Sequence, residues 1–255
     1  SLGLVGSEMC IRDSYTADFF LNNLTKSNNK YPNLKIWTNK DLDQNIYTDF
    51  NEAISEDGYK LFLKKLYEYG FTVIQNCKTE MSSVEKIAKK IGYVRESIFG
   101  GLWSFESNED KADSAYTQEE LRPHTDSTYS NDAPGLQLLL CCHYKASGGD
   151  SIMVDGFKIA EKIKNEKKEI YDLLTQIEVT GQYIGDGVFL KAKRPIFRVN
   201  SDSELIQVSF NNYDRAPFKF SEDKTKKFYE AIKEFDLIAN NLSLIHISEP
   251  TRPRE

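Results

Sequence analysis

The sequence predicts a mixed α+β fold, in which a helix–strand–helix unit is followed by short strands with flanking helices. Two amphipathic patterns, at residues 57–69 and 84–91, predict the helices of the first unit. A continuous apolar run at 135–144, the turn S-G-G-D and a second apolar segment at 151–155 predict a buried hairpin. The segment H-T-D at 124–126 lies just before this hairpin and is the main candidate for a functional site.

The first unit follows a polar stretch at residues 15–51, which predicts loop and short strands such as L-K-I-W at 34–37. The first helix ends at Gly70, because glycine favours helix C-termini, and F-T-V-I-Q then predicts a strand. The second helix ends at Gly92. The apolar faces of the two helices are Tyr59, Phe62, Leu63, Leu66 and Tyr67, and Val84, Ile87, Ala88 and Ile91. We interpret this unit as scaffold, since its polar residues are solvated Lys and Glu.

The second half of the chain combines helices with alternating strands. A helix is predicted at 156–174, strands at 177–184, 194–200 and 205–210, and a last helix from a Ser221 cap to about residue 238. The inward faces of these helices are Ile159, Ala160 and Ile163, and Phe228, Ile232 and Phe235. The period-2 alternation of the strands is typical of a sheet with one solvated face.

The composition is that of an ordinary globular protein and argues against two kinds of partner. The 255-residue chain has a net charge of −6 and a pI near 5.3, whereas a nucleic-acid surface needs a basic patch. No apolar stretch approaches the roughly 18 to 20 residues of a membrane span. The four cysteines lack C-x-x-C spacing, which predicts reduced thiols and a cytoplasmic protein. A mitochondrial location is the alternative for a eukaryotic source, although no transit peptide is visible.

Both ends of the chain resemble translated sequencing-adaptor tails, at residues 1–14 and 243–255. Such segments are excluded from fold reasoning. We therefore expect one domain at 15–242, with the scaffold at 15–95 and a strand-rich part that carries the site at 96–242.

His124 and Asp126 are spaced to form half of a metal site. In extended backbone, residues i and i+2 point to the same face, so an imidazole and a carboxylate converge on one point. Two histidines and one carboxylate, with open positions opposite, hold iron in non-haem Fe(II) oxygenases. The other histidines are His143, within the predicted buried strand, and His246, within the carboxyl-terminal tail. A surface turn with an aspartate cap is the alternative interpretation of H-T-D.

Aromatic residues gather in a glycine-containing, acidic loop just upstream of this pair. Phe99, Trp103, Phe105 and Tyr116 lie between residues 98 and 116. Such residues usually fill a core, but these have polar neighbours in sequence. Polar neighbours favour the interpretation that these aromatic side chains line the site.

Six motifs together carry a resemblance to a known family. They are F-G-G-L-W, D-S-A-Y-T, H-T-D-S-T-Y, P-G-L-Q-L-L, G-G-D-S-I-M-V-D-G-F and F-N-N-Y-D-R-A-P, in this order over roughly residues 34–240. The set closely resembles the carnitine-biosynthesis dioxygenases, that is trimethyllysine and γ-butyrobetaine dioxygenases, which are relatives of taurine dioxygenase. The resemblance implies a double-stranded β-helix (jelly-roll, cupin-like) core, incomplete at the C-terminus. It also implies Fe(II), 2-oxoglutarate as co-substrate, O2, and hydroxylation of a small trimethylammonium-bearing substrate.

The resemblance gives individual residues a role in the metal and co-substrate site. His124 and Asp126 match the first two iron ligands, and Ser151 matches a hydroxyl that binds the 2-oxoglutarate carboxylate. A strand-initial serine is the alternative for Ser151. The family's distal histidine and its 2-oxoglutarate-binding arginine lie beyond the last matching motif, and His143 is not expected to replace that histidine. We therefore expect this chain by itself to be inactive.

The resemblance also implies the substrate subsite. Phe99, Trp103 and Tyr116 match an aromatic cage, which suits a quaternary ammonium because N(CH3)3+ donates no ordinary hydrogen bond. Asp113 matches a position facing the other end of the substrate, and Asn211, at the end of a neighbouring strand, could donate to the substrate carboxylate. A carboxylate at Asp113 favours the α-ammonium of Nε-trimethyllysine over the bare carboxylate of γ-butyrobetaine. A solvated loop acid is the alternative for Asp113.

Three functions follow from these observations. The first is 3-hydroxylation of Nε-trimethyllysine, and the second is the γ-butyrobetaine dioxygenase reaction. The third belongs to another class, a non-catalytic module that binds quaternary ammonium ligands without iron. The sequence leaves a homodimer open as the assembly.

Overall fold

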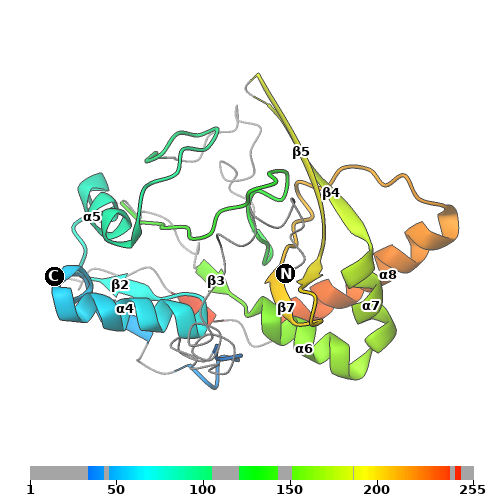
Figure 1. Cartoon of the computed structure of the whole chain (residues 1–255), viewed down its shortest axis with the longest axis horizontal. Helices are drawn as coiled ribbons and strands as arrows, with labels where there is room; N and C mark the ends of the chain where they lie inside the picture. Colours follow the sequence, from blue (N-terminus) through cyan, green and yellow to red (C-terminus); the bar gives the residue numbers. More distant parts are fainter. Residues whose placement is uncertain are drawn as a thin grey trace, which may run out of the picture. The chain divides into compact units, whose positions relative to one another are not determined.

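A computed structural model of the chain describes residues 34–42, 46–104, 121–142, 151–185, 187–241 and 245–247. Helices and short strands alternate over this part of the chain, which confirms the mixed α+β class (Figure 1). In chain order they are β1 (Tyr47–Asp49), α3 (Phe50–Ile54), α4 (Glu56–Tyr69), β2 (Val73–Gln75), α5 (Met81–Ile91), β3 (Ser151–Met153), α6 (Gly156–Glu166), α7 (Lys168–Gln176), β4 (Glu178–Gly185), β5 (Val188–Pro195), β6 (Phe197–Val199), β7 (Leu205–Val208), α8 (Glu222–Asn241) and β8 (Ile245–Ile247). Within the described ranges, none of the helices combines the length and the apolar character that a bilayer crossing requires.

The sheets are smaller than the predicted jelly-roll core. In the described residues the strands pair only in twos, as β1–β2 (parallel), β3–β8, β4–β5 and β6–β7 (antiparallel). The predicted hairpin of 135–144 with 151–155 is wrong as far as the structure describes it. Residues 135–142 are irregular, with Leu136 and Leu139 48% and 68% exposed. An apolar run becomes a strand only where a neighbouring segment satisfies its backbone, and no described segment pairs with this one.

The second half of the predicted hairpin does form a strand, but with another partner. β3 pairs antiparallel with β8, in the register Ser151↔Ile247. β8 lies within residues 243–255, which the sequence set apart as a tail. The proposed division into tails and one domain stays a prediction.

The helix–strand–helix unit forms as predicted. The Ser55 hydroxyl accepts a hydrogen bond from the Gly58 N–H (3.0 Å) at the start of α4, and Gly70 ends the helix in the left-handed region at φ 76°. Gly92 ends α5. The buried core of this unit comprises Phe50, Ala53, Phe62 and Ile87. The prediction that Tyr67 lies on the apolar face of its helix is wrong, since 44% of its surface is exposed.

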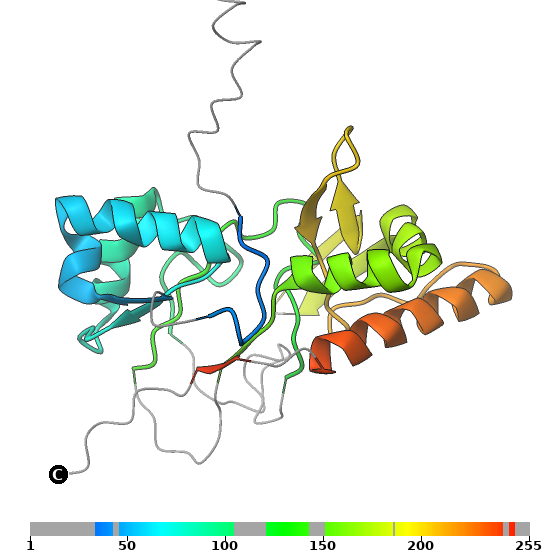
Figure 2. The same ribbon diagram turned by 90° about the horizontal axis from the view of Figure 1, so that it is seen from below.

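A second core lies between α6, α7 and α8, which run side by side in Figure 2. The single helix predicted at 156–174 is in fact two, because Lys167 leaves helical geometry at φ −144°, ψ 64°. The predicted inward residues of these helices are all buried. The largest fully buried side chains here are Phe197, Phe228, Ile163 and Leu174.

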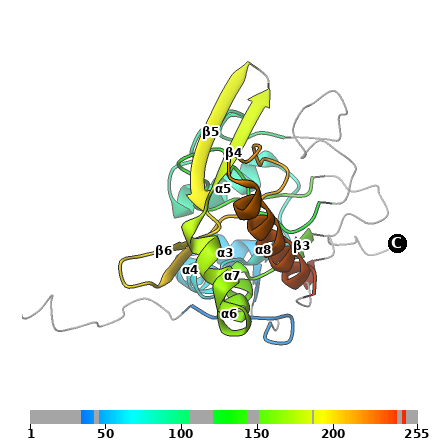
Figure 3. The same cartoon turned by 90° about the vertical axis from the view of Figure 1, so that its right-hand side faces the viewer.

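The β4–β5 hairpin extends beyond the three helices (Figure 3). β4 was predicted, whereas β5 was not, because its alternation is masked by charged residues in V-F-L-K-A-K-R-P. Residues 214–216 run along β4, with Gln182 N donating to Asp214 O (2.7 Å) and Ala216 N to Thr180 O (2.9 Å). This contact brings the N-N-Y-D-R segment to the sheet.

Candidate functional site

The H-T-D segment is attached to the second core by a reciprocal contact with Phe210. Thr125 N donates to Phe210 O (2.7 Å), and Phe210 N donates to the Thr125 hydroxyl (2.9 Å). The Phe210 ring is 5% exposed and lies 4.2 Å from the Phe235 ring of α8, centroid to centroid. The position of the candidate ligands is therefore set by packing on α8.

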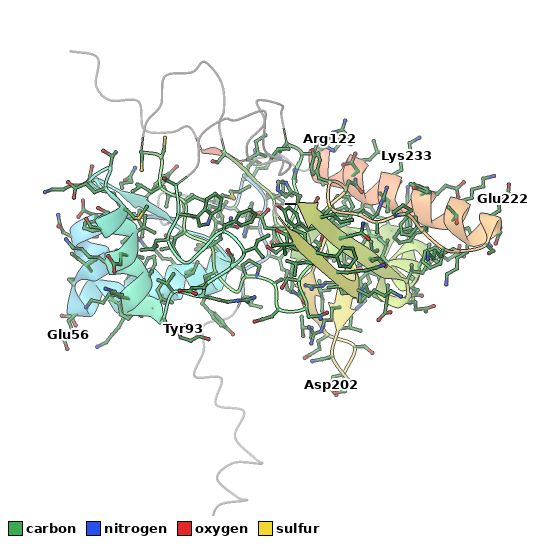
Figure 4. The ribbon with its side chains drawn as sticks, turned by 90° about the horizontal axis from the view of Figure 1, so that it is seen from above. Glu56, Tyr93, Arg122, Asp202, Glu222 and Lys233 are labelled. Carbon is green, nitrogen blue, oxygen red and sulfur yellow. The ribbon has the colours of Figure 1, made fainter. Side chains whose placement is uncertain are left out.

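Arg122 provides a second attachment. Its guanidinium Nη1 lies 2.6 Å from Asp236 Oδ2, and Figure 4 shows Arg122 beside α8. Its backbone N–H donates to the Tyr213 hydroxyl (2.9 Å). The Tyr213 ring also meets the His124 ring edge to face, at 5.7 Å and 77°. Sequence reasoning did not single out Tyr213, although it lies in the polar N-N-Y-D-R cluster that ends a strand.

His124 and Asp126 converge as their spacing predicts. His124 Nε2 lies 3.2 Å from Asp126 Oδ1. His124 Nδ1 lies 2.8 Å from the Arg122 carbonyl, which can only accept, so we assign the proton of the neutral ring to Nδ1. The hydrogen bond between the two side chains raises the pKa of His124 and lowers the pKa of Asp126. In the neutral ring Nε2 then keeps a lone pair for a metal.

The donor set fits a divalent metal ion. Two ligands that are about 2.1 Å from one ion, at a right angle, lie about 3.0 Å apart; the two side chains are close to that separation. A histidine that donates its other N–H to a backbone carbonyl is the usual arrangement of a metal ligand. Across the described residues, no His, Cys, Asp or Glu joins this pair to form a group of three. His143 lies outside those residues, and for His246 only the backbone in β8 is described.

Two of the predicted cage aromatics lie together. The rings of Phe99 and Trp103 stack at 5.0 Å and 29°. Ser97 and Gly100 exchange two backbone hydrogen bonds of 3.0 Å, and Gly100 takes φ 95°, so this tight turn places Phe99. Both rings are partly exposed and can contact a ligand.

Two further aromatic residues, which the sequence did not predict, lie beside the Phe99–Trp103 pair. Tyr183 of β4 meets Phe99 edge to face at 6.3 Å, and Tyr129 lies 5.2 Å from Tyr183. Both tyrosines come from segments remote from the F-G-G-L-W motif, which is why no local pattern could group them. Tyr116 and Asp113 lie outside the described residues.

Ser151 and Asn211 are placed in different surroundings. Ser151 is the half-buried first residue of β3, and its role stays a prediction. The Asn211 side chain shapes its own loop: Oδ1 accepts from Tyr213 N (2.7 Å), and Nδ2 donates to Asp214 Oδ2 (2.9 Å). One Nδ2 hydrogen of Asn211 is not used in this contact.

Two cavities adjoin this region. The larger, of about 220 Å³, is lined by Arg122, Pro123, His124, Phe210, Asn212, Tyr213 and Asp236. The smaller, of about 20 Å³, lies against β4, β5 and residues 209–215, and is described below. Phe210 and Asn212 line both. His124 therefore borders a space large enough for a small organic molecule.

Comparison with known proteins identifies the family of the chain. Residues 38–248 match the family described as "Taurine catabolism dioxygenase TauD, TfdA family". The matched part exceeds half of the chain and includes the H-T-D segment. The chain belongs to the TauD/TfdA family, and this family implies a double-stranded β-helix fold with Fe(II) and 2-oxoglutarate.

Three relatives illustrate the similarity. Trimethyllysine dioxygenase of Meyerozyma guilliermondii is 34% identical over 216 residues, which cover 80% of this chain and 54% of that protein. Mitochondrial trimethyllysine dioxygenase of Rattus norvegicus is 30% identical over 205 residues, 78% of this chain and 48% of that protein. γ-Butyrobetaine dioxygenase of a Pseudomonas species is 32% identical over 188 residues, which cover 73% of this chain and 49% of that protein. The chain spans about half the length of these relatives.

Proposed function

We propose that this chain is part of an Fe(II)- and 2-oxoglutarate-dependent dioxygenase that hydroxylates a trimethylammonium substrate, with Nε-trimethyllysine as the preferred one. The observation that carries the proposal is the convergence of His124 Nε2 and Asp126 Oδ1, in a chain of the TauD/TfdA family. The family membership supports the reaction class, and the two similar trimethyllysine dioxygenases support the substrate.

The residues have separate tasks in this proposal. His124 and Asp126 hold the iron, with the Arg122 carbonyl and Tyr213 orienting the imidazole. Iron, when bound with 2-oxoglutarate and O2, supplies the oxidising power for C–H hydroxylation, with succinate and CO2 as products. Ser151 binds a carboxylate of 2-oxoglutarate.

Phe99 and Trp103, with Tyr116, receive the trimethylammonium group on their ring faces. The stacked pair already present in the structure supports this assignment. Asp113 and Asn211 recognise the amino-acid end of the substrate. The alternative substrate is γ-butyrobetaine, which the similarity to the Pseudomonas γ-butyrobetaine dioxygenase supports.

An Fe(II) titration tests the metal assignment. We expect the 255-residue chain to bind Fe(II) weakly under anaerobic conditions, because the described residues bring only two ligands together. Asp126→Ala should abolish that binding, whereas Asp132→Ala, at an exposed loop position, should not change it. Tight stoichiometric binding would reveal a further ligand. Equal binding by the wild type and Asp126→Ala would show that Asp126 is not a metal ligand, and would overturn the metal assignment.

Substrate preference in the whole protein tests the assignment of the substrate and of Asp113. We expect Nε-trimethyllysine to be hydroxylated in preference to γ-butyrobetaine, and Asp113→Asn to shift the preference towards γ-butyrobetaine. A wild type that prefers γ-butyrobetaine, or a variant with unchanged preference, would contradict the assignment of the substrate. It would leave the metal assignment intact.

A further inference from the structure

Arg215 has a buried donor without a partner among the described residues. Its Nη1 atom is shielded from solvent and makes no hydrogen bond there. The guanidinium is fixed between two rings, 5.1 Å from the Phe218 centroid and 5.0 Å from the Tyr229 centroid. Because its backbone also bridges to Gly181 of β4, this side chain has little freedom to reach water. Buried donors are almost always satisfied, so an unsatisfied one points to a water molecule, an ion or a ligand group beside it.

A second arginine lines the same small cavity. Arg194 of β5 donates to the Ser130 carbonyl, and burial lowers the pKa of both arginines. The other lining residues are uncharged, and Thr128, Thr180, Ser209, Asn211 and Asn212 contribute hydroxyl and amide groups. No Asp or Glu is among the described residues that line it. Two desolvated cations facing one space without an anion are unfavourable.

The neighbouring carboxylate is engaged elsewhere. Asp214 precedes Arg215, but its Oδ2 accepts from Asn211 Nδ2 (2.9 Å) and Thr128 Oγ1 (3.5 Å). The buried Nη1 makes no hydrogen bond to Asp214 or to any other described residue. The charge of Arg215 is left for an anion from outside the described residues.

We propose that this Arg194–Arg215 cavity is a subsite for one carboxylate group. A cavity of about 20 Å³ is little more than one water molecule needs, so it can receive the oxygen end of one carboxylate group but not a whole metabolite. The planar guanidinium matches a carboxylate in shape and charge. Since Phe210 and Asn212 also line the cavity beside His124, the carboxylate belongs to a molecule that extends towards the candidate metal site. That last step rests on the proposed function, whose two carboxylate sources are 2-oxoglutarate and the amino-acid end of the substrate.

Acetate is the probe for the subsite itself, and it needs neither iron nor turnover. In the 255-residue chain, exchange of chloride for acetate at constant ionic strength should raise the melting temperature saturably. Arg215→Gln should weaken the acetate response about tenfold or more, as expected when a hydrogen bond to a charged group is lost. Lys89→Gln removes an exposed cation of α5, paired with Glu85 and absent from the lining of this cavity, and should leave the response unchanged. If Arg215→Gln does not fold, Arg194→Gln and Arg215→Lys provide the same comparison.

The outcomes separate the subsite from the proposed function. The proposal is overturned if acetate has no effect on the wild type, or if it affects the wild type and the arginine variants equally. Either result would show that the cavity holds only water or an internal carboxylate. Competition of 2-oxoglutarate or Nε-trimethyllysine against ¹³C-acetate, followed by NMR, identifies the source. If acetate binds and neither competes, the subsite stands and its link to the reaction fails.

Discussion

The backbone N–H of Arg122 donates to the hydroxyl of Tyr213 over 2.9 Å, and so ties the candidate ligand segment to a loop ninety-one positions further along the chain. The same tyrosine packs its ring against His124. The Arg122 carbonyl in turn orients the imidazole through Nδ1. Residues 122, 124 and 213 thus form one unit around the candidate metal ligand.

Tyr213→Phe should loosen this unit while keeping the ring. We expect a loss of about 0.5–1.5 kcal/mol in the free energy of unfolding, the usual value of one hydrogen bond, measured by urea denaturation. The proton of His124 should no longer be confined to Nδ1, which long-range ¹H–¹⁵N spectra report directly. Tyr93→Phe is the control, because Tyr93 is 91% exposed. An unchanged His124 tautomer in Tyr213→Phe would show that the Arg122 carbonyl suffices.

Gly181→Ala should displace the turn that follows the candidate ligands. A Cβ atom at Gly181 would lie 2.5 Å from the carbonyl carbon and oxygen of Thr128 and 2.7 Å from Tyr129 N. Because these neighbours are backbone atoms, the variant should lose about 1–3 kcal/mol of stability, measured by denaturation. Gly135→Ala meets no atom within 4 Å and serves as the control. Equal stability of the two variants would indicate that the close approach of β4 and residue 128 is wrong.

Trp103→Ala should weaken substrate binding rather than stability. One desolvated cation–π contact is worth about 2 kcal/mol, about thirtyfold in affinity, measured as the Kd of Nε-trimethyllysine in the whole protein. The affinity for 2-oxoglutarate should stay the same. Trp37→Ala is the matched control, since Trp37 is 5% exposed and donates to Tyr69 O (2.8 Å). Its loss should lower stability by about 3–5 kcal/mol and leave substrate affinity unchanged. If Trp103→Ala instead lowers stability and leaves substrate affinity unchanged, Trp103 is a core residue.

The titration of Asp155 should make the free energy of unfolding depend on pH in the acid range. Burial raises the pKa of this carboxyl above its ordinary value of 3.8, against the effect of hydrogen bonds from three backbone N–H groups. The folded state then binds the proton more tightly than the unfolded state. The stability from this group is therefore fully present below the unfolded pKa and is lost as pH rises through the folded pKa.

The comparison that isolates this effect is Asp155→Asn, which cannot titrate but can still cap α6. The wild type should lose stability relative to Asp155→Asn as the pH rises through the acid range, measured by urea unfolding at several pH values. A difference that grows in favour of the wild type with rising pH would mean that hydrogen bonding outweighs burial.

The sequence by itself determined the helices and the convergence of the candidate ligand pair. The faces of α4, α5 and α8 follow from a 3.6-residue period, which is readable in a short window, and Gly70 and Gly92 end their helices for local steric reasons. The convergence of His124 and Asp126 needs only the geometry of two neighbouring residues. Helix boundaries were less exact, since nothing local in E-K-K-E announced the break at Lys167.

Only the tertiary structure decided what surrounds that pair. Phe210 and Tyr213 reach residues 122–125 across more than eighty positions, and Arg194 and Arg215 meet one cavity from separate segments. The apolar run at 135–142 shows the same dependence, because a strand needs a partner for its backbone and a period of two says nothing about where that partner lies. Pairing between remote segments depends on packing that no local window contains.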